Sequence, residues 1–389
     1  MTAVTTTVTL HTLHIGQIEN GVAEVGRVDT GVFIELGVEG VDLVRWVGEG
    51  LALDEVRRLF TERYGTEPDL DDFLEGMASC GFVKTEATPV ADEAPRRGIA
   101  LLAGVPQHRV AWLLSWPMAV LYYAVWLAVP AALVLWPSLL PLPSDALLLD
   151  RVLTNALVIA VIAWTLVLLH EGAHAISVRA LGVTGRLSVS RRMWFLVAQT
   201  EMSGIRSVPR RARYAPYLAG LTWDLTLVTS CFALELAGIG GQLVRTIAYT
   251  LTLAIIYQFL IFMRTDLYFV LGNWLRLGDL MGDTRRWLAN LALRLLGRPP
   301  RHDLGDVPAR ELRVIRWYAP FYLLGSLAVT AALVLLTLPA MKTMLTIAFS
   351  GLGRGISDAS FWDGLGFLAL VALQLGTFGW VIATERRQA

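Results

Sequence analysis

The sequence predicts a mainly α-helical membrane protein, in which a polytopic helical bundle of about six spans follows a small N-terminal α+β domain of winged-helix-like character. Three observations carry this prediction. Hydrophobic residues make up 55% of the 389-residue chain and charged residues 17%, whereas soluble domains carry about 25% charged residues. Apolar runs recur at the length of about 20 residues that a bilayer-crossing helix needs. Charge is divided unequally along the chain. We therefore expect residues 1–85 to form the small domain, 86–110 a linker and 111–389 the bundle.

The charge division separates two differently built parts. Residues 1–95 contain 6 basic and 18 acidic side chains, a net charge of −12, and residues 96–389 contain 27 and 15, a net charge of +12. Because phosphate binding needs a basic footprint, the N-terminal part is not expected to bind nucleic acid. Cys80 and Cys231 predict no disulfide framework. Residues 1–20 lack the basic and apolar regions of a secretory signal peptide.

Short-range patterns predict the elements of the N-terminal domain. Apolar residues at 22–25 and 32–36 flank Asp29-Thr30-Gly31, which indicates a β-hairpin. Apolar residues at helical spacing predict three helices, over residues 41–47, 53–64 and 70–78. Gly81-Phe82-Val83 is expected to close the domain. The prolines and mixed charges of residues 86–98 are typical of a linker.

Six apolar segments are expected to cross the membrane: 111–136, 153–178, 215–238, 246–264, 317–340 and 361–383. Basic residues favour the cytoplasmic side. If the N-terminus is cytoplasmic, the inner loops hold 23 Lys and Arg residues and the outer loops hold 4. This asymmetry predicts a multi-pass protein of a bacterial inner or plasma membrane, in contact with lipid and with both termini inside. The sequence predicts no particular oligomeric state.

The second segment leads into a motif with metal-binding chemistry, His170-Glu171-Gly172-Ala173-His174. Residues four apart share one face of a helix, so both imidazoles can reach one metal ion. Glu171 beside them is a candidate general base for hydrolysis, with Zn²⁺ as the expected metal. The alternative is a chance match. The 17 residues from Leu153 to Leu169 contain no charge, and ionisable groups within a span are costly and usually functional, which disfavours chance. The motif is expected near the cytoplasmic face.

A catalytic zinc site usually takes three protein ligands. Four carboxylates lie in or beside the apolar segments: Glu201, Asp224, Glu235 and Asp266. Asp266 follows the fourth segment and is expected at the depth of the histidine motif. The other interpretation is an interfacial acid paired with Arg264. Asp224 in the third segment is the second candidate, either as the ligand or as a group that orients the scissile bond.

These motifs resemble the site-2 protease family of intramembrane zinc metalloproteases. The resemblance rests on the histidine motif near the inner end of one span and on an aspartate in a later span. The stretch Met263-Arg264-Thr265-Asp266-Leu267 keeps that aspartate but lacks the family's upstream Asn-Pro and its following glycine. Ala219-Gly220-Leu221-Thr222-Trp223-Asp224 occupies the place of the family's Gly-Pro and asparagine element. The resemblance implies zinc on His170, His174 and Asp266, and catalysis by Glu171.

Residues 183–202 between the second and third segments have strand-like character around Arg191-Arg192. Relatives in the site-2 protease family carry a β-hairpin at this place. A free strand edge aligns an extended substrate by β-addition. The alternative is an ordinary basic loop on anionic lipid, and the sequence leaves both interpretations open.

The first 85 residues resemble the PqqD-like recognition elements of ribosomal peptide biosynthesis, through the hairpin, the three helices and Gly81-Phe82-Val83. Such modules bind the leader of a precursor peptide as an added strand. Together the two resemblances imply a zinc metalloendopeptidase that removes leaders from precursor peptides. Two alternatives stay open. One is regulated intramembrane proteolysis of a membrane-anchored signalling protein, and the other is a non-catalytic peptide transporter or immunity protein.

Overall fold

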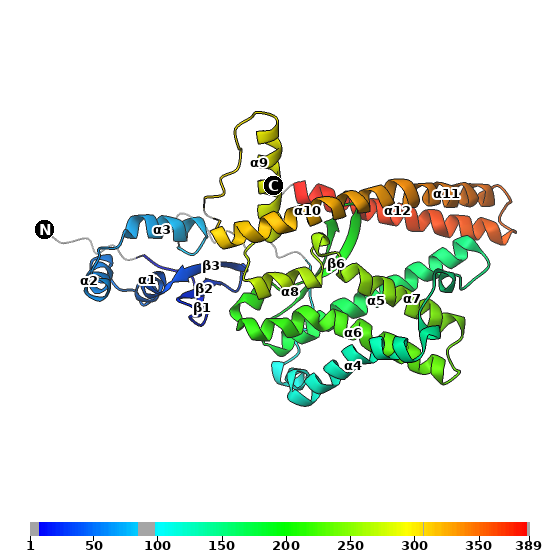
Figure 1. Cartoon of the computed structure of the whole chain (residues 1–389), viewed down its shortest axis with the longest axis horizontal. Coiled ribbons are helices and arrows are strands. Elements are labelled where there is room, and N and C mark those ends of the chain that lie inside the picture. The colour runs from blue at the N-terminus through cyan, green and yellow to red at the C-terminus, as the bar shows by residue number, and fades with distance from the viewer. Residues whose placement is uncertain (1–7, 85–97, 306, 387–389) are drawn as a thin grey trace. The chain divides into compact units, whose positions relative to one another are not determined.

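A computed structural model of the chain describes residues 8–84, 98–305 and 307–386 (Figure 1). The chain divides into two compact units. Unit 1 comprises Met1–Ala111, Val178–Ser188 and Thr200–Arg213, and unit 2 comprises Trp112–Ser177, Val189–Gln199 and Tyr214–Ala389. Residues 86–97 of the predicted linker lie outside the described residues, and residues 98–110 are described.

Unit 1 contains the predicted hairpin. Strands β2 (Val22–Arg27) and β3 (Val32–Gly37) are antiparallel, with Val25 opposite Ile34, and the short strand β1 (His14–Ile15) pairs with the other side of β2. Gly31 adopts φ +73° in the connection, a conformation that glycine tolerates without steric cost. The sheet order is β1-β2-β3, so β3 is an edge strand in the described part of the chain.

The three predicted helices of unit 1 are confirmed. They are α1 (Val38–Gly48), α2 (Leu53–Tyr64) and α3 (Leu70–Ser79). The Asp69 side chain caps α3 by accepting a hydrogen bond from the Asp72 amide, and Gly65 ends α2 in the left-handed conformation. Phe82 is fully buried, and the amide of His11 donates to its carbonyl at 2.9 Å. The predicted closing segment is therefore part of the small α+β fold.

Unit 1 also takes in two segments that the sequence assigned to the bundle. Ile99 of strand β4 (Ile99–Ala100) pairs with Leu187 of strand β5 (Arg186–Arg192). Arg213 donates to both carboxylate oxygens of Glu24 on β2, and both side chains are largely buried. Pairing across long sequence separations thus ties residues 178–188 and 200–213 to unit 1.

The segment with strand-like character forms β5 and β6 (Phe195–Glu201), in a sheet of order β4-β5-β6. The two strands turn at Met193, which adopts φ +52°. The hairpin interpretation of residues 183–202 is confirmed in its secondary structure. In the described residues β6 is the edge of this sheet.

Among the described residues, five helical stretches are long and apolar enough to cross a membrane. They are α4 (Trp116–Leu135), α5 (Val152–Ala180), α6 (Arg210–Leu236), the continuous stretch Ala309–Leu352 and Ala359–Thr384 of α12 (Ala359–Arg386). The stretch Ala309–Leu352 consists of α10 (Ala309–Ala332), a π-helical turn η7 (Leu333–Thr337) and α11 (Leu338–Leu352). The membrane bundle is thus supported in its general form.

Five of the six predicted spans coincide with these stretches, and the fourth does not. The fourth predicted segment folds as α7 (Gly241–Gln258), which is not among the five stretches. Its first turns are polar: Gln242 and Thr246 donate to the carbonyl of Asp145 in the connection η4 (Pro143–Ala146). After α7 the chain breaks into the short turn η6 (Ile261–Met263) instead of continuing as a helix.

Two further helices, α8 (Asp266–Leu275) and α9 (Leu280–Leu295), lie between the fourth and fifth predicted spans. Figure 1 shows α11 and α12 running antiparallel. Glycines permit their close approach, since a Cβ on Gly364 would collide with the carbonyl oxygen of Ala348. The remaining short turns are η1 (Gln107–Arg109), η2 (Ala111–Leu114), η3 (Pro137–Leu139) and η5 (Ser203–Ser207).

Candidate metal centre

Helix α5 carries the histidine motif. It runs unbroken from Val152 to Ala180, so His170 and His174 lie one turn apart on the same face, with their Nε2 atoms 3.2 Å apart. Their burial is unusual for ionisable groups: His170 is 8% exposed, His174 2% and Glu171 8%. Buried ionisable side chains in an apolar helix need partners, and the surrounding helices supply them.

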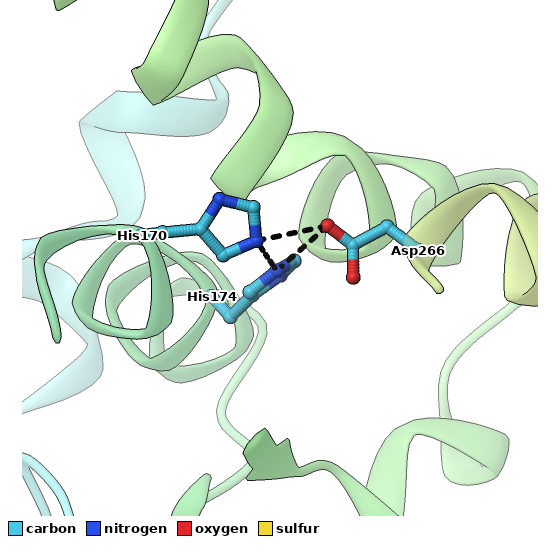
Figure 2. A group of neighbouring side chains, drawn as sticks. All are labelled: His170, His174 and Asp266. Atoms are coloured by element: carbon cyan, nitrogen blue, oxygen red, sulfur yellow. Dashed lines mark hydrogen bonds and ion pairs between the residues drawn. The ribbon is translucent and has the colours of Figure 1, made fainter. Parts of the chain in front are cut away.

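Asp266, the first residue of α8, meets both histidines. Its Oδ2 lies 3.0 Å from Nε2 of His170 and 3.1 Å from Nε2 of His174 (Figure 2). The three ligand atoms therefore form a nearly equilateral triangle. Bonds of about 2.0–2.1 Å to zinc place neighbouring ligand atoms of a tetrahedron about 3.3 Å apart, close to the observed sides. The group can hold one metal ion with little rearrangement.

The opposite ring nitrogens are held so that both Nε2 atoms face this triangle. Nδ1 of His174 bonds to the carbonyl oxygen of Pro216 at 2.7 Å, and Nδ1 of His170 bonds to Oδ2 of Asp224 at 2.8 Å. A carbonyl only accepts, so His174 must donate from Nδ1, and an ionised Asp224 imposes the same on His170. Each Nε2 then keeps the lone pair that a metal ligand needs.

Asp224 is thus not a ligand in this geometry. Its carboxylate contacts Nδ1 of His170, whereas the metal-facing atom of that ring is Nε2. The sequence had left Asp224 open as a third ligand or as a group that orients the substrate. The structure instead places Asp266 against both Nε2 atoms, and places Asp224, which is 2% exposed, against Nδ1 of His170.

Helix α6 carries both Pro216 and Asp224, the partners of the two Nδ1 atoms, and it approaches the histidines closely. A Cβ on Gly220 would collide with Nε2 of His170 and of His174. Any side chain at this position would therefore fill the space beside the ligand atoms. Glycine at this position therefore leaves the two ligand nitrogens unobstructed by a side chain of α6.

Gln258, the last residue of α7, was missed in the sequence. Its Oε1 accepts a hydrogen bond from the backbone N–H of Asp266 at 3.0 Å, and its Nε2 lies 3.4 Å from Nε2 of His170. The side chain is 8% exposed. Thr265 adds a second link, because its hydroxyl donates to the Gln258 carbonyl at 2.7 Å. The sequence signal that could have identified Gln258 was a polar amide in an apolar segment, eight residues before Asp266.

The electrostatics of the site favour an ionised Asp266. Burial would raise its pKa, but the positive charge of a protonated His174 and hydrogen bonds donated by protonated imidazoles more than offset this and hold the pKa well below its usual range. A metal cation that replaces those protons on the Nε2 atoms would act on the pKa in the same direction. Asp266 is therefore a carboxylate across the physiological pH range, as metal ligation requires.

The structure brings together His170, His174 and Asp266, holds Glu171 buried on the same helix as the histidines, and assigns Asp224 to the far side of one ring. No protein-family model matches the chain, and comparisons with curated proteins and with solved structures found no match either.

Proposed function

We propose that this protein is a membrane-embedded zinc endopeptidase that removes the leader from a ribosomally made precursor peptide. The observation that carries the proposal is the triangle of His170 Nε2, His174 Nε2 and Asp266 Oδ2, with sides of 3.0, 3.1 and 3.2 Å, next to a buried Glu171. Five apolar helical stretches support a membrane location, and the distribution of basic residues favours a site near the cytoplasmic face.

The donor set fits zinc. Two imidazole nitrogens and one carboxylate oxygen are the ligand types of catalytic zinc sites, which leave one position open for water or substrate. The absence of a side chain at Gly220 leaves both Nε2 atoms unobstructed on the side of α6. When bound, zinc would supply Lewis-acid polarisation of the scissile carbonyl and of the attacking water.

Glu171 handles the proton in this mechanism. Its carboxylate takes a proton from the attacking water, and the protonated side chain then donates to the leaving amide nitrogen as the C–N bond breaks. Asp224 and the Pro216 carbonyl keep the two imidazoles in the required tautomer throughout. Because Oε1 of Gln258 is occupied by the Asp266 amide, its NH₂ group is directed at the site and can donate to the substrate carbonyl.

A peptide substrate has to be extended to be cut. The edge strand β6 offers backbone groups to which such a segment can pair by β-addition. This pairing would fix the register of the substrate without requiring a particular sequence.

Unit 1 suits capture of a leader. It presents the small sheet β1-β2-β3 with β3 at its edge, and its resemblance to PqqD-like recognition elements implies strand addition there. The net charge of −12 over residues 1–95 argues against a nucleic acid partner. Binding the leader on the same chain would raise the effective concentration of the scissile segment at the catalytic site.

The proposal is tested by coexpressing precursor peptides encoded beside this gene with the wild-type protein or with Glu171→Gln, followed by mass spectrometry. We expect cleavage by the wild type only, with equal zinc in both proteins. Cleavage by the variant at the wild-type rate would contradict the mechanism. Transport of intact peptide into proteoliposomes without cleavage would instead support a transporter. Cleavage confined to a membrane-anchored signalling protein would support regulated proteolysis.

A further inference from the structure

Arg192, the last residue of β5, reaches from the β5–β6 hairpin to the backbone that leads into Asp266. Its Nη1 donates to the carbonyl oxygen of Met263 at 2.7 Å and also to that of Arg264. Its Nη2 donates to Oε1 of Gln199 on β6 at 2.7 Å. One guanidinium therefore joins both strands of the hairpin to the turn that precedes the metal-facing aspartate.

That turn needs support. Arg264 adopts the left-handed conformation, with φ 55° and ψ 44°, which is unfavourable for a residue with a Cβ. The conformation aims the first turn of α8, and with it Asp266, toward α5. The bonds that Gln258 and Thr265 make hold this turn from the α7 side. Arg192 holds it from the hairpin side, at the two carbonyls where the chain reverses.

The hairpin is itself seated firmly enough to act as an anchor. Met193, next to Arg192, packs against a buried cluster that includes Phe262, Met263 and Tyr268. The indole N–H of Trp194 donates to the hydroxyl of Thr330 on α10 at 3.3 Å. The guanidinium of Arg192 is thus held by hydrogen bonds on two sides, to Gln199 on β6 and to the carbonyls of the turn before Asp266.

We propose that Arg192 is a positioning residue, which sets the location of Asp266 relative to His170 and His174 and so makes metal affinity depend on the β5–β6 hairpin. This inference rests on the metal site of the proposed function. Its consequence is linkage. A peptide paired to β6 orders the strand that carries Gln199, and Gln199 orders Arg192. By thermodynamic reciprocity, a peptide bound there raises zinc affinity by the same factor by which zinc raises peptide affinity.

The test uses the purified full chain in lipid nanodiscs and four variants: Arg192→Gln, Arg192→Lys, Gln199→Met and, as a control of equal charge change, Arg294→Gln on the exposed side of α9. Zinc affinity is measured by competition with a chromogenic chelator, with and without a non-cleavable peptide. Residues that orient a metal ligand typically contribute 10–100-fold to affinity. We expect a loss of that size for Arg192→Gln and no change for Arg294→Gln.

The other two variants separate positioning from general damage to the fold. Lysine can donate to the two carbonyls but cannot also reach Gln199 with a second nitrogen, so Arg192→Lys should recover most of the zinc affinity but not the effect of peptide. Gln199→Met should lose only the effect of peptide. The thermal midpoint of each variant, measured without zinc, should equal that of the wild type. If Arg192 only stabilised the fold, its substitution would lower this midpoint.

Zinc affinity of Arg192→Gln within twofold of wild type would overturn the inference. If that variant does not fold, unchanged peptide linkage in both Arg192→Lys and Gln199→Met would do so. Failure of the proposed function is recognised separately. A wild-type protein that binds zinc at this site but never cleaves peptide refutes the peptidase, and the affinity measurements still decide the role of Arg192.

Discussion

The two units differ in where their apolar and polar side chains lie. In the N-terminal part nearly all buried side chains are apolar, such as Val25 and Val41, and the acidic side chains of α2 and α3 face water. The exception is Asp42 on α1, which is 5% exposed and accepts a hydrogen bond from the Tyr64 hydroxyl. In unit 2 large apolar side chains face outward, with Trp317 82% exposed, while His174 and Asp224 are almost fully enclosed. The hydrophobic effect organises the first unit. In the second, lipid satisfies the outer surface and the buried polar groups mark the site.

Because of this contrast, the same substitution is expected to affect stability differently in the two units. In unit 1 a truncated buried side chain costs stability, because apolar surface loses its partners and a cavity remains. In unit 2 the same truncation on the outer surface costs little, whereas a change of one buried polar atom removes chemistry. The following predictions test this contrast in order of expected effect.

The largest effect is expected at Glu171. Glu171→Gln keeps the size of the side chain but cannot accept a proton, and general base catalysis contributes roughly 10²–10⁴-fold. We expect cleavage to fall by about that factor or more while zinc content stays at the wild-type level. Single-turnover cleavage of a labelled precursor together with metal analysis of the same sample measures both. Loss of zinc along with activity would argue against an acid–base role.

The next effect concerns the core of unit 1. Leu70 is 2% exposed and packs with Leu43, Val47, Val56 and Phe60. Leu70→Ala should destabilise this region by about 2–5 kcal/mol, from lost transfer free energy and a residual cavity. Hydrogen–deuterium exchange of residues 8–84 in the full chain measures the change. Protection equal to wild type would show that this core is not a cooperative unit.

A smaller effect is expected at Asp224. Asp224→Asn keeps an acceptor for Nδ1 of His170 but removes the negative charge that makes the ring a better donor to metal. We expect zinc affinity to fall by about 10-fold, and by about 100-fold for Asp224→Ala. Asp303→Asn in an exposed loop serves as the control. If Asp224→Ala binds zinc as the wild type does, Asp224 does not orient His170.

The smallest effect is expected on the outer surface of unit 2. Leu373 on α12 is 67% exposed, so Leu373→Ala should change stability by less than about 0.5 kcal/mol. The substitution is the same as at Leu70, so the pair compares the two units directly. Thermal unfolding in nanodiscs checks it. A loss as large as that at Leu70 would mean that this face packs against protein rather than lipid.

The sequence predicted the elements that depend on short-range pattern. The hairpin around Gly31, the three helices of unit 1 and the spacing of His170 and His174 all follow from periods of two or 3.6 residues. Asp266 could be proposed because charge is rare near apolar helices, and it indeed meets both histidines.

What the sequence could not predict depends on contacts between distant residues. Whether Asp224 faces Nδ1 or Nε2 of His170 is set by the packing of α6 against α5, and no pattern encodes it. In the sequence, Gln258 is one amide within an apolar run. Only the structure shows that its Oε1 accepts a hydrogen bond from the backbone N–H of Asp266. Length and apolarity over residues 246–264 did not reveal that the helix ends at Gln258 so that the chain can turn to Asp266.

The central claim is that His170, His174 and Asp266 share one zinc ion. The most direct measurement is the zinc stoichiometry of the purified full chain, together with zinc K-edge absorption, for the wild type and for Asp266→Asn. We predict one zinc per chain bound to two imidazoles and oxygen, and a loss of zinc affinity of more than about 100-fold in the variant. Unchanged zinc binding by Asp266→Asn, or a wild-type protein that takes up no zinc, would contradict the account.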